Sequence, residues 1–466
     1  MTATAQPIPA EAPATAVPAR RDSPLTEPAI LFMIIMAMMT IGILMVYSAS
    51  RTVYAATDGY YFTRHLIFVP LALAALVAGS RVPYAKLNRP WVAWSILILA
   101  VVLLAGVLVV GEGHGGAKRW FSLHAGPVRV SFQPSEYAKF AMVIFMAWFF
   151  SRPKAQPGTL LRGFLPTITI IGIVCVLIIK EDFGTGALVG LVAVLMCLVA
   201  GWRLWYPLLL IAPGAVGFYK FVWLVPYRRT RLTTFINPWE YFNSSGWHVC
   251  QSLMAIGSGG LFGVGLGAGI QKLYIPEVTT DFIFAAVCEE MGLLGGLLVL
   301  GLFGVFIWRA GRIVKAAPDR FGFLLACGIL LTIGLQAAIN IGVVTSALPT
   351  KGISLPFISY GGSGLVMMSF AVGLLASVAR RCRSAEELEK LSGALVYVPA
   401  TRGVPVVRVA RRTPEATAAT MEAPAPEPAA SESGGVAPVS EVPAPDASTP
   451  PVTGESATEE EPSGNA

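Results

Sequence analysis

Long apolar stretches separated by short polar segments dominate the sequence. Most of these stretches reach the roughly 20 residues that a helix needs to cross the hydrocarbon core of a bilayer. The shorter ones can borrow polar flanking residues or lie in a locally thin, protein-lined region. The ten runs are Ala29–Ser50, Tyr61–Gly79, Trp91–Val110, Tyr137–Phe150, Phe164–Ile179, Gly184–Ala200, Leu204–Val225, Phe282–Trp308, Phe321–Val344 and Phe357–Val378. The pattern predicts an all-α, polytopic membrane protein with about ten transmembrane helices.

The composition agrees with a bilayer environment. Of the 466 residues, 55% are hydrophobic and only 13% are charged, whereas soluble domains carry about 25% charged residues. The first run follows a Pro/Ala-rich leader and is long, so we interpret it as a membrane anchor and not as a cleaved signal peptide. No phosphate-binding glycine loop of the G-x-x-x-x-G-K-[ST] type occurs, so we expect no ATP hydrolysis, and we expect no nucleic-acid partner.

The positions of Lys and Arg predict the orientation of the helices, because short cationic loops stay on the cytoplasmic side. Counting from a cytoplasmic amino terminus places nearly all cationic connections inside. These are Arg20, Arg21, Arg81, Lys86, Arg89, Arg152, Lys154, Arg162, Arg203, Arg309, Arg312, Lys315, Arg320, Arg380, Arg381 and Arg383. Both termini are therefore predicted to be cytoplasmic, with a large extracytoplasmic loop between helices 7 and 8.

Composition also divides the chain into three parts. Residues 1–27 and 384–466 are rich in Ala, Pro and Thr or Glu and are predicted to be disordered cytoplasmic tails, while residues 28–383 form the membrane domain. The C-terminal tail passes a basic segment between Arg402 and Arg412, which is either simply solvated or a docking arm for anionic lipid or a cytoplasmic partner. The six cysteines show neither a disulfide pattern nor metal-ligand spacing.

Three outward segments, 111–136, 226–281 and 346–356, are the candidates for chemistry. The long one opens with Arg228, Arg229 and Arg231, on the side where positive charge is normally scarce. Guanidinium groups bind phosphate oxygens in a bidentate way, which favours a phosphate-bearing substrate. The alternative is unspecific binding of lipid head groups.

Charged residues at the mouths of helices add to this picture. Asp281 precedes an apolar run, so it is either a helix N-cap or a functional carboxylate, and the two interpretations are compatible. Glu136 and Lys139 lie three residues apart on one helix face, either as a structural ion pair or as a charged pair lining a polar cavity. Asp182 adds a further outward acid.

The excess of outward cations over acids suits a diphosphate substrate at the membrane surface. Because a diphosphate is a good leaving group, its displacement needs a base for the incoming hydroxyl, and one carboxylate suffices. A glycoside hydrolase would need a second carboxylic acid to protonate its leaving group. The sequence therefore favours transfer from an activated donor.

Several motifs resemble those of the SEDS family (shape, elongation, division and sporulation) of bacterial membrane proteins. In the family's order they are Gly-Ala-Lys-Arg-Trp, Phe-Gln-Pro-Ser-Glu, Gln-Ser-(x5)-Gly-Ser-Gly-Gly, Thr-Asp-Phe-Ile-Phe-Ala with Glu289-Glu290, and Pro-Phe-Ile-Ser-Tyr-Gly-Gly-Ser. The resemblance covers roughly residues 29–383. Lys-Leu-Tyr-Ile-Pro-Glu and Leu-Pro-Thr-Lys-Gly look more like the division branch than the elongation branch.

The resemblance implies a peptidoglycan glycosyltransferase of the inner membrane, acting at the division septum on lipid II, a disaccharide-peptide carried on undecaprenyl diphosphate. Asp281 would be the catalytic base, and transfer would invert the anomeric carbon. The substrate-binding residues implied or suggested by the motifs are Lys118, Arg119, Gln133, Ser135, Glu136, Lys139, Asp182, Arg228, Arg231, Thr280, Lys351, Ser359, Tyr360, Gly361 and Ser363. A divalent cation, Mg²⁺ or Mn²⁺, could bridge Asp281 or Asp182 to the diphosphate.

The implied partners are a class B penicillin-binding protein and other division proteins. One departure from the family pattern is Lys180-Glu181 before Asp182, where Gln-Pro is usual. Two other functions stay open at this point. A lipid II flippase would use midplane polar groups and broken helices, and a scaffold that only recruits a transpeptidase would need no acid at Asp281.

Overall fold

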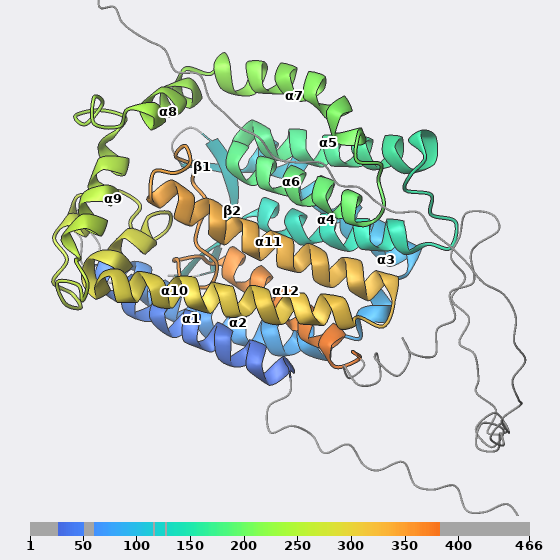
Figure 1. Cartoon of the computed structure of the whole chain (residues 1–466), viewed down its shortest axis with the longest axis horizontal. Helices are drawn as coiled ribbons and strands as arrows, with labels where there is room; N and C mark the ends of the chain where they lie inside the picture. The colour runs from blue at the N-terminus through green and yellow to red at the C-terminus, as the bar shows by residue number, and fades with distance from the viewer. Residues whose placement is uncertain (1–26, 51–59, 115–116, 126–127, 383–466) are drawn as a thin grey trace, which may run out of the picture. The chain divides into compact units, whose positions relative to one another are not determined.

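The computed structural model describes residues 27–50, 60–114, 117–125 and 128–382 (Figure 1). The predicted tails lie outside the described residues, apart from Glu27. The helices are α1 Glu27–Ala49, α2 Tyr60–Arg81, α3 Pro90–Val110, α4 Pro134–Ser151, α5 Leu165–Glu181, α6 Phe183–Val199, α7 Ile211–Phe218, α8 Pro226–Ile236, α9 Trp247–Ser258, α10 Ile283–Ala316, α11 Arg320–Val344 and α12 Ser363–Ala379. Short helical turns are η1 Tyr84–Leu87, η2 Leu160–Phe164, η3 Tyr206–Leu210, η4 Tyr219–Trp223 and η5 Gln271–Leu273.

Each of the ten predicted apolar runs coincides with a helix or, for the seventh run, with the continuous series η3, α7 and η4. Within the described residues, seven helical stretches are long and apolar enough to cross a bilayer. Helices α6 and α12 are apolar but have only 17 residues, and α4 carries two charged residues near its start. The prediction of an all-α, polytopic membrane protein is confirmed.

Two loop regions differ from the expectation. The outward segment after α3 forms a small antiparallel sheet of β1 Glu112–His114, β2 Ala117–Ala125 and β3 Val128–Phe132, in the order β1-β2-β3. Its third strand reads Val-Arg-Val-Ser-Phe. The strand-favouring residues Val, Val and Phe alternate with the polar residues Arg and Ser. The last predicted run begins too early, because residues 357–362 form a loop and α12 starts only at Ser363.

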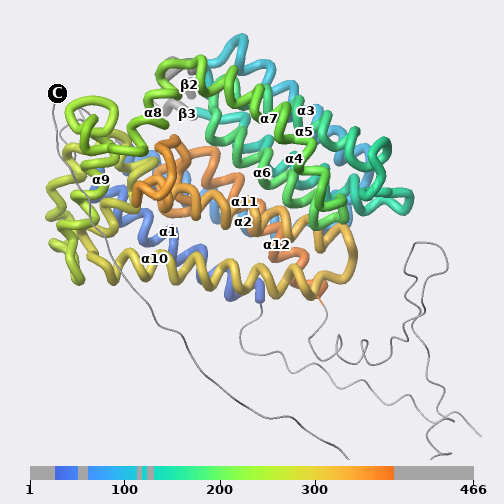
Figure 2. Tube along the Cα trace, turned by 45° about the horizontal axis from the view of Figure 1, so that its top comes forward, coloured from blue at the N-terminus to red at the C-terminus, as the bar shows by residue number. Residues whose placement is uncertain are grey.

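Contacts between loops define the two ends of the helix bundle. At one end Glu27 pairs with Arg309 at 3.2 Å, and the Tyr84 hydroxyl donates to Asp319 at 2.5 Å. These residues belong to connections predicted to be cytoplasmic, so the prediction that they share one side is consistent with the structure. The opposite end carries residues 111–114, 117–125, 128–133, 224–282 and 345–362, and we call it the loop end (Figure 2).

Close helix packing between α2 and α12 depends on two glycines. A β-carbon on Gly79 would lie 2.3 Å from the carbonyl oxygen of Phe370, and one on Gly373 would lie 2.3 Å from that of Leu76. Small residues let helix backbones approach closely where lipid provides no hydrophobic drive between helices. This pair fixes α12 and hence the loop that precedes it at the loop end.

Candidate functional site

Asp281 lies at the loop end, in the turn that leads into α10. The backbone amides of Thr280 and Asp281 both donate to the carbonyl of Glu277, at 3.1 and 3.0 Å, which closes this turn. Phe282 occupies the N-cap of α10 and no side chain caps the helix. The N-cap interpretation of Asp281 is therefore wrong: the turn ends one residue too early for its carboxylate to cap α10.

The carboxylate of Asp281 is partly desolvated and lies near other negative charges. Burial raises its pKa to about 7, helped by the negative charges of Glu277 and Asp182 and opposed by the cations Arg231 and Arg119. Among the described residues, no donor makes a hydrogen bond to this carboxylate. A carboxyl group with these properties is half ionised near neutral pH and can accept a proton.

A loop with a lysine passes directly beside this carboxylate. A β-carbon on Gly352 would lie 3.1 Å from Asp281 Oδ2, so the backbone at residue 352 touches the acid. The neighbouring Lys351 places its ammonium nitrogen 4.9 Å from the centre of the Phe183 ring. Burial lowers the pKa of Lys351, and the Asp182 charge raises it. Lys351, Asp182 and Asp281 therefore belong to one electrostatic cluster.

Asp182 has a structural role within that cluster. It is the N-cap of α6, where it accepts hydrogen bonds from the amide of Thr185 at 3.0 Å and from its hydroxyl at 2.8 Å. Both carboxylate oxygens are thus engaged, and the side chain is buried. The substrate-binding role predicted for Asp182 remains a prediction, and its negative charge acts on Lys351 and Asp281 in any case.

Arg228 and Arg231, two predicted cations of the long loop, make contacts within the protein. Arg228 donates to the carbonyl oxygens of Phe221, Ile179 and Lys180 at 2.8–3.2 Å, which joins α8 to the end of α5. Arg231 lies 4.5 Å from the Tyr227 ring centre, and its Nη1 lies 3.5 Å from the carbonyl oxygen of Thr350. Nη2 of Arg231 also donates to the Tyr227 hydroxyl, so both arginines make hydrogen bonds within the protein.

Hydrogen bonds join the sheet to Glu181, the residue before Asp182. Arg119 Nε donates to the carbonyl of Glu181 at 2.9 Å, and the amide of Lys118 donates to the Glu181 carboxylate at 2.6 Å. Lys118 is exposed. The charge of Arg119 is felt by both Asp281 and Arg228. The structure therefore brings Arg119 to the cluster from a segment more than 150 residues away in sequence.

Glu136 and Lys139 form a buried ion pair at the start of α4. Lys139 Nζ lies 2.9 Å from Glu136 Oε2 and donates to Gln336 Oε1 at 2.7 Å. Pro134 at the first turn and Gln133 at the N-cap begin the helix here. The amide of Gln133 in turn donates to the Ser363 hydroxyl at 3.1 Å, linking α4 to α12.

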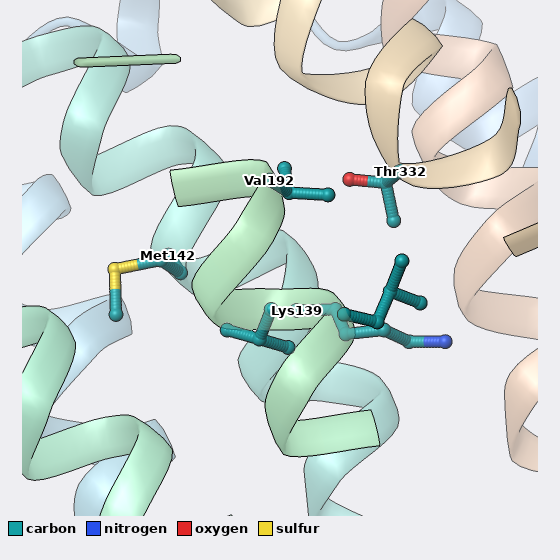
Figure 3. Close-up of a pocket in the computed structure, with 6 residues that line it drawn as sticks. Lys139, Met142, Val192 and Thr332 are labelled. Atoms are coloured by element: carbon teal, nitrogen blue, oxygen red, sulfur yellow. The ribbon is translucent and has the colours of Figure 1, made fainter. Parts of the chain in front are cut away.

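The space beside Lys139 is very small. A cavity of about 10 Å³, roughly one water molecule, lies along the side chain (Figure 3). Its lining residues are Lys139, Met142, Leu188, Val189, Val192 and Thr332. No sugar fits there, so the arrangement favours the structural ion pair over the charged pair lining a polar cavity.

Two amides one turn apart on α11 connect this ion pair to Asp281. Gln336 Nε2 donates to the carbonyl of Ser354 at 2.9 Å. Asn340 Nδ2 donates to the carbonyls of Asp281 at 2.8 Å and Ile353 at 2.7 Å. Asn340 thus fixes the acid and the Lys351 loop to the same helix. The sequence reasoning missed both amides, although polar residues spaced i, i+4 within an apolar run are a visible signal.

Replacing Asn340 by Leu is expected to lower the rate of the reaction about 10- to 100-fold, because a displacement of about 1 Å in a reacting group has effects of that size. The measurement is the initial rate of the glycosyl transfer that the family resemblance implies, with the purified variant, alongside its melting temperature. Thr332→Val is the matched control: Thr332 is buried on the same helix, and its hydroxyl bonds only the Gly328 carbonyl. Equal rates for both variants would contradict the assignment.

The remaining predicted residues lie around these two groups. Thr280 donates its hydroxyl to Glu277, and the amide of Tyr360 donates to the carbonyl of Thr279 at 2.8 Å. The Ser359 hydroxyl accepts from the amide of Leu355 within the loop before α12. Ser135 is buried in the first turn of α4, and Gly361 is partly buried beside Ser363. These residues shape the loop end.

The arrangement offers few ligands for a metal ion. Within the described ranges, no three His, Cys, Asp or Glu side chains come together as a metal site. Asp182 has both carboxylate oxygens bonded to Thr185, so the carboxylate of Asp281 is the better ligand of the two acids. A divalent ion would then need oxygens from the substrate, which is how Mg²⁺ is usually held beside phosphates.

Comparison with known protein families covers nearly the whole membrane domain. A family model described as "Cell cycle protein", which takes in FtsW, RodA and SpoVE, matches residues 28–384. The chain is 41% identical to stage V sporulation protein E of Bacillus subtilis over 77% of this chain and 98% of that protein. It is 40% identical to the probable peptidoglycan glycosyltransferase FtsW of Coxiella burnetii, over 74% of this chain and 94% of that protein.

Solved structures show the same fold. One neighbour, described under "Structural coordination of polymerization and crosslinking by a peptidoglycan synthase complex", has a TM-score of 0.62 and 26% identity, covering 75% of this chain and 97% of the other. Rod shape determining protein RodA of Thermus thermophilus, solved as wild type and as an Asp-to-Ala mutant, gives a TM-score of 0.55 and 26% identity, covering 76% and 97% of the two chains.

Proposed function

Because the chain belongs to the SEDS family of cell cycle proteins, we propose that it is a peptidoglycan glycosyltransferase that polymerises lipid II into glycan strands. The observation that carries this proposal is Asp281 at the loop end, an acid with a pKa near 7 that interacts with the charges of Arg231 and Arg119 and lies against the backbone of the Lys351 loop. One base among several cations is what transfer from a diphosphate donor requires.

The proposed reaction is a single displacement. Asp281 accepts the proton of the acceptor sugar hydroxyl while that oxygen attacks the anomeric carbon of the donor. The bond between this carbon and the diphosphate oxygen breaks, the configuration inverts, and undecaprenyl diphosphate leaves. A pKa near 7 suits this role because a general base works best when its pKa lies close to the operating pH.

The cations of the cluster are proposed to bind the diphosphate. Lys351 carries positive charge on the loop beside Asp281, Arg231 on helix α8, and Arg119 on the sheet. Fixed positive charges aimed at the leaving group stabilise the negative charge that develops on it, without reorganisation during the reaction. When a divalent ion is bound, Asp281 would be its protein ligand, and the ion would supply further neutralisation of the diphosphate.

The proposed setting is the bacterial inner membrane at the division septum, with the loop end facing outward. The cationic connections gathered at the opposite end support this orientation. The proposed partners are a class B penicillin-binding protein, which would crosslink the new strand, and other division proteins. The solved neighbour described as a peptidoglycan synthase complex supports the first of these.

The direct test is polymerisation of labelled lipid II by the purified protein, alone and with its class B partner. Ladders of glycan strands support the proposal. If no ladder forms even with the partner, while labelled lipid II crosses a vesicle bilayer faster with the protein, the flippase function replaces it. If neither activity appears and the partner still binds, the protein is a scaffold.

The rate of polymerisation is expected to rise with pH through about 7, because Asp281 acts as a base only when ionised. Glu277→Gln should move this rise to lower pH, since the Glu277 charge raises the pKa of Asp281. Arg231→Gln should move it to higher pH, since the Arg231 charge lowers that pKa. Initial rates across the pH range test both shifts. Identical profiles for wild type and both variants would show that another group controls the pH dependence.

A further inference from the structure

The segment Gly259–Ile270, which we call the glycine loop, is packed onto a break in helix α10. Gly292 has φ 66° and ψ −164°, a conformation open essentially only to glycine, and it interrupts the helical hydrogen bonding of α10. Helix α9 and the start of α10 lie together at the loop end of the bundle (Figure 1). The glycine loop follows α9 directly in sequence and so reaches this break.

The glycine loop satisfies the backbone groups that the break releases. The amides of Leu293 and Leu294 donate to the carbonyls of Gly260 and Leu261, at 2.9 and 3.2 Å. In the other direction, the carbonyls of Glu289 and Glu290 accept from the amides of Val264 and Gly265, at 3.0 and 3.1 Å. Four exchanged bonds thus replace those that a regular helix would make. Within a bilayer, interrupted helical backbone persists only where protein restores such bonds.

Buried charged side chains at the end of the glycine loop also bind it. The Glu289 carboxylate accepts from the amides of Ile270, Gln271 and Lys272, at 2.6–3.2 Å. Lys272 forms a buried ion pair with Glu290, and its Nζ also donates to the Ser48 hydroxyl at 2.7 Å. The glycine loop is therefore anchored to both α10 and α1.

The outer face of this anchored loop is apolar and exposed. The exposed fractions are 61% for Leu261, 79% for Phe262, 45% for Val264, 64% for Leu266 and 62% for Ile270. No Asp, Glu, Lys or Arg occurs between residues 249 and 271. Water would be an unfavourable environment for five large apolar side chains on so rigid a support.

This face continues the lipid-facing surface of α10. Leu293 and Leu294, whose amides bind the loop, are themselves 52% and 54% exposed, and the exposed Leu297 follows one turn later. A helix rises 1.5 Å per residue, so about 20 residues cross the hydrocarbon core, which is about 30 Å thick. Counted from Trp308 at the opposite end of α10, that length ends in the region of Glu289. The glycine loop therefore lies at the boundary of the hydrocarbon core.

We propose that the glycine loop is embedded in the leaflet at the loop end, with Leu261, Phe262, Val264, Leu266 and Ile270 contacting the acyl chains of lipids. Continuity with the exposed leucines of α10 and the absence of charge favour lipid over a protein surface. The embedded loop would fix the depth at which Asp281 stands relative to the membrane surface, since only ten residues separate Ile270 from Asp281.

Spin labels on single introduced cysteines test the proposal in nanodiscs of phosphatidylethanolamine and phosphatidylglycerol. The variants are Phe262→Cys and Leu266→Cys, with Leu297→Cys as a membrane control and Glu240→Cys as a water control. All are built on Cys382→Ser, because the other native cysteines are buried. Accessibility of each label to oxygen and to a water-soluble nickel chelate is measured for the whole protein.

The expected result is that the labels at 262 and 266 favour oxygen over the nickel chelate, as at Leu297, with the opposite preference at Glu240. A preference for the nickel chelate at both positions would overturn the proposal and leave the face free for a protein partner. Two positions are used so that one poorly folded variant does not decide the outcome. The result does not depend on the proposed catalytic function, because no substrate is present.

Discussion

Replacing Asp281 by Asn is expected to reduce lipid II polymerisation by about 10²- to 10⁴-fold, the usual contribution of a general base. Asn has nearly the same shape but cannot accept the proton of the acceptor hydroxyl. The hydrogen bond from Asn340 is unaffected, because it goes to the backbone carbonyl of residue 281. The measurement is the initial rate of ladder formation by wild type and variant in the same lipid.

The same substitution is expected to leave the protein at least as stable as wild type at pH 8. A folded-state pKa raised from 3.8 to about 7 means that Asp281 stabilises the fold below pH 3.8, and that this contribution is lost as pH rises through 7. Asn carries no charge, so it does not incur the desolvation cost of the ionised acid. Glu277→Gln removes a neighbouring exposed carboxylate and should keep its activity. A variant at position 281 that melts earlier, or a Glu277→Gln variant that is equally inactive, would contradict the assignment of Asp281 as the base.

The sequence predicts the helices because hydropathy reflects the local solvent of each segment. All ten apolar runs became helices, and Asp281 was identified as a candidate from its position at the start of a run. The membership of the SEDS family is confirmed by the match over residues 28–384. The sheet after α3 is not predicted, because long apolar runs mark only the helices and the strand-favouring alternation of Val128–Phe132 is just five residues long.

Pairings between distant segments could not be predicted in the same way. Arg228 was expected to bind phosphate, yet its donors lie on carbonyls at the end of α5, about fifty residues earlier in the chain. The six glycines of 257–267 predict a backbone that bends tightly and comes close to another surface or ligand, but not that this surface is the broken turn at Gly292. Such contacts depend on where two backbones run relative to each other, which no local pattern records.

Replacing Lys351 by Met is expected to reduce polymerisation about 10²-fold, the effect of removing one fixed charge from a site that stabilises a developing negative charge. Met keeps the length of the side chain over the Phe183 ring but loses the ammonium group whose charge interacts with Asp182. Lys351→Arg retains the charge and should recover most of the lost rate, which separates an electrostatic role from a packing role.

The matched control for Lys351→Met is Lys180→Met. Lys180 is an exposed cation at the same end of the bundle, and only its backbone carbonyl takes part in a described bond, with Arg228. Both variants lose one positive charge from the loop end, so a general weakening of substrate attraction would affect them equally. A loss confined to Lys351, together with recovery by Arg, would show that the charge acts locally, at the position of Lys351. If Lys180→Met lost as much activity, the charge would act only through the net potential of the loop end.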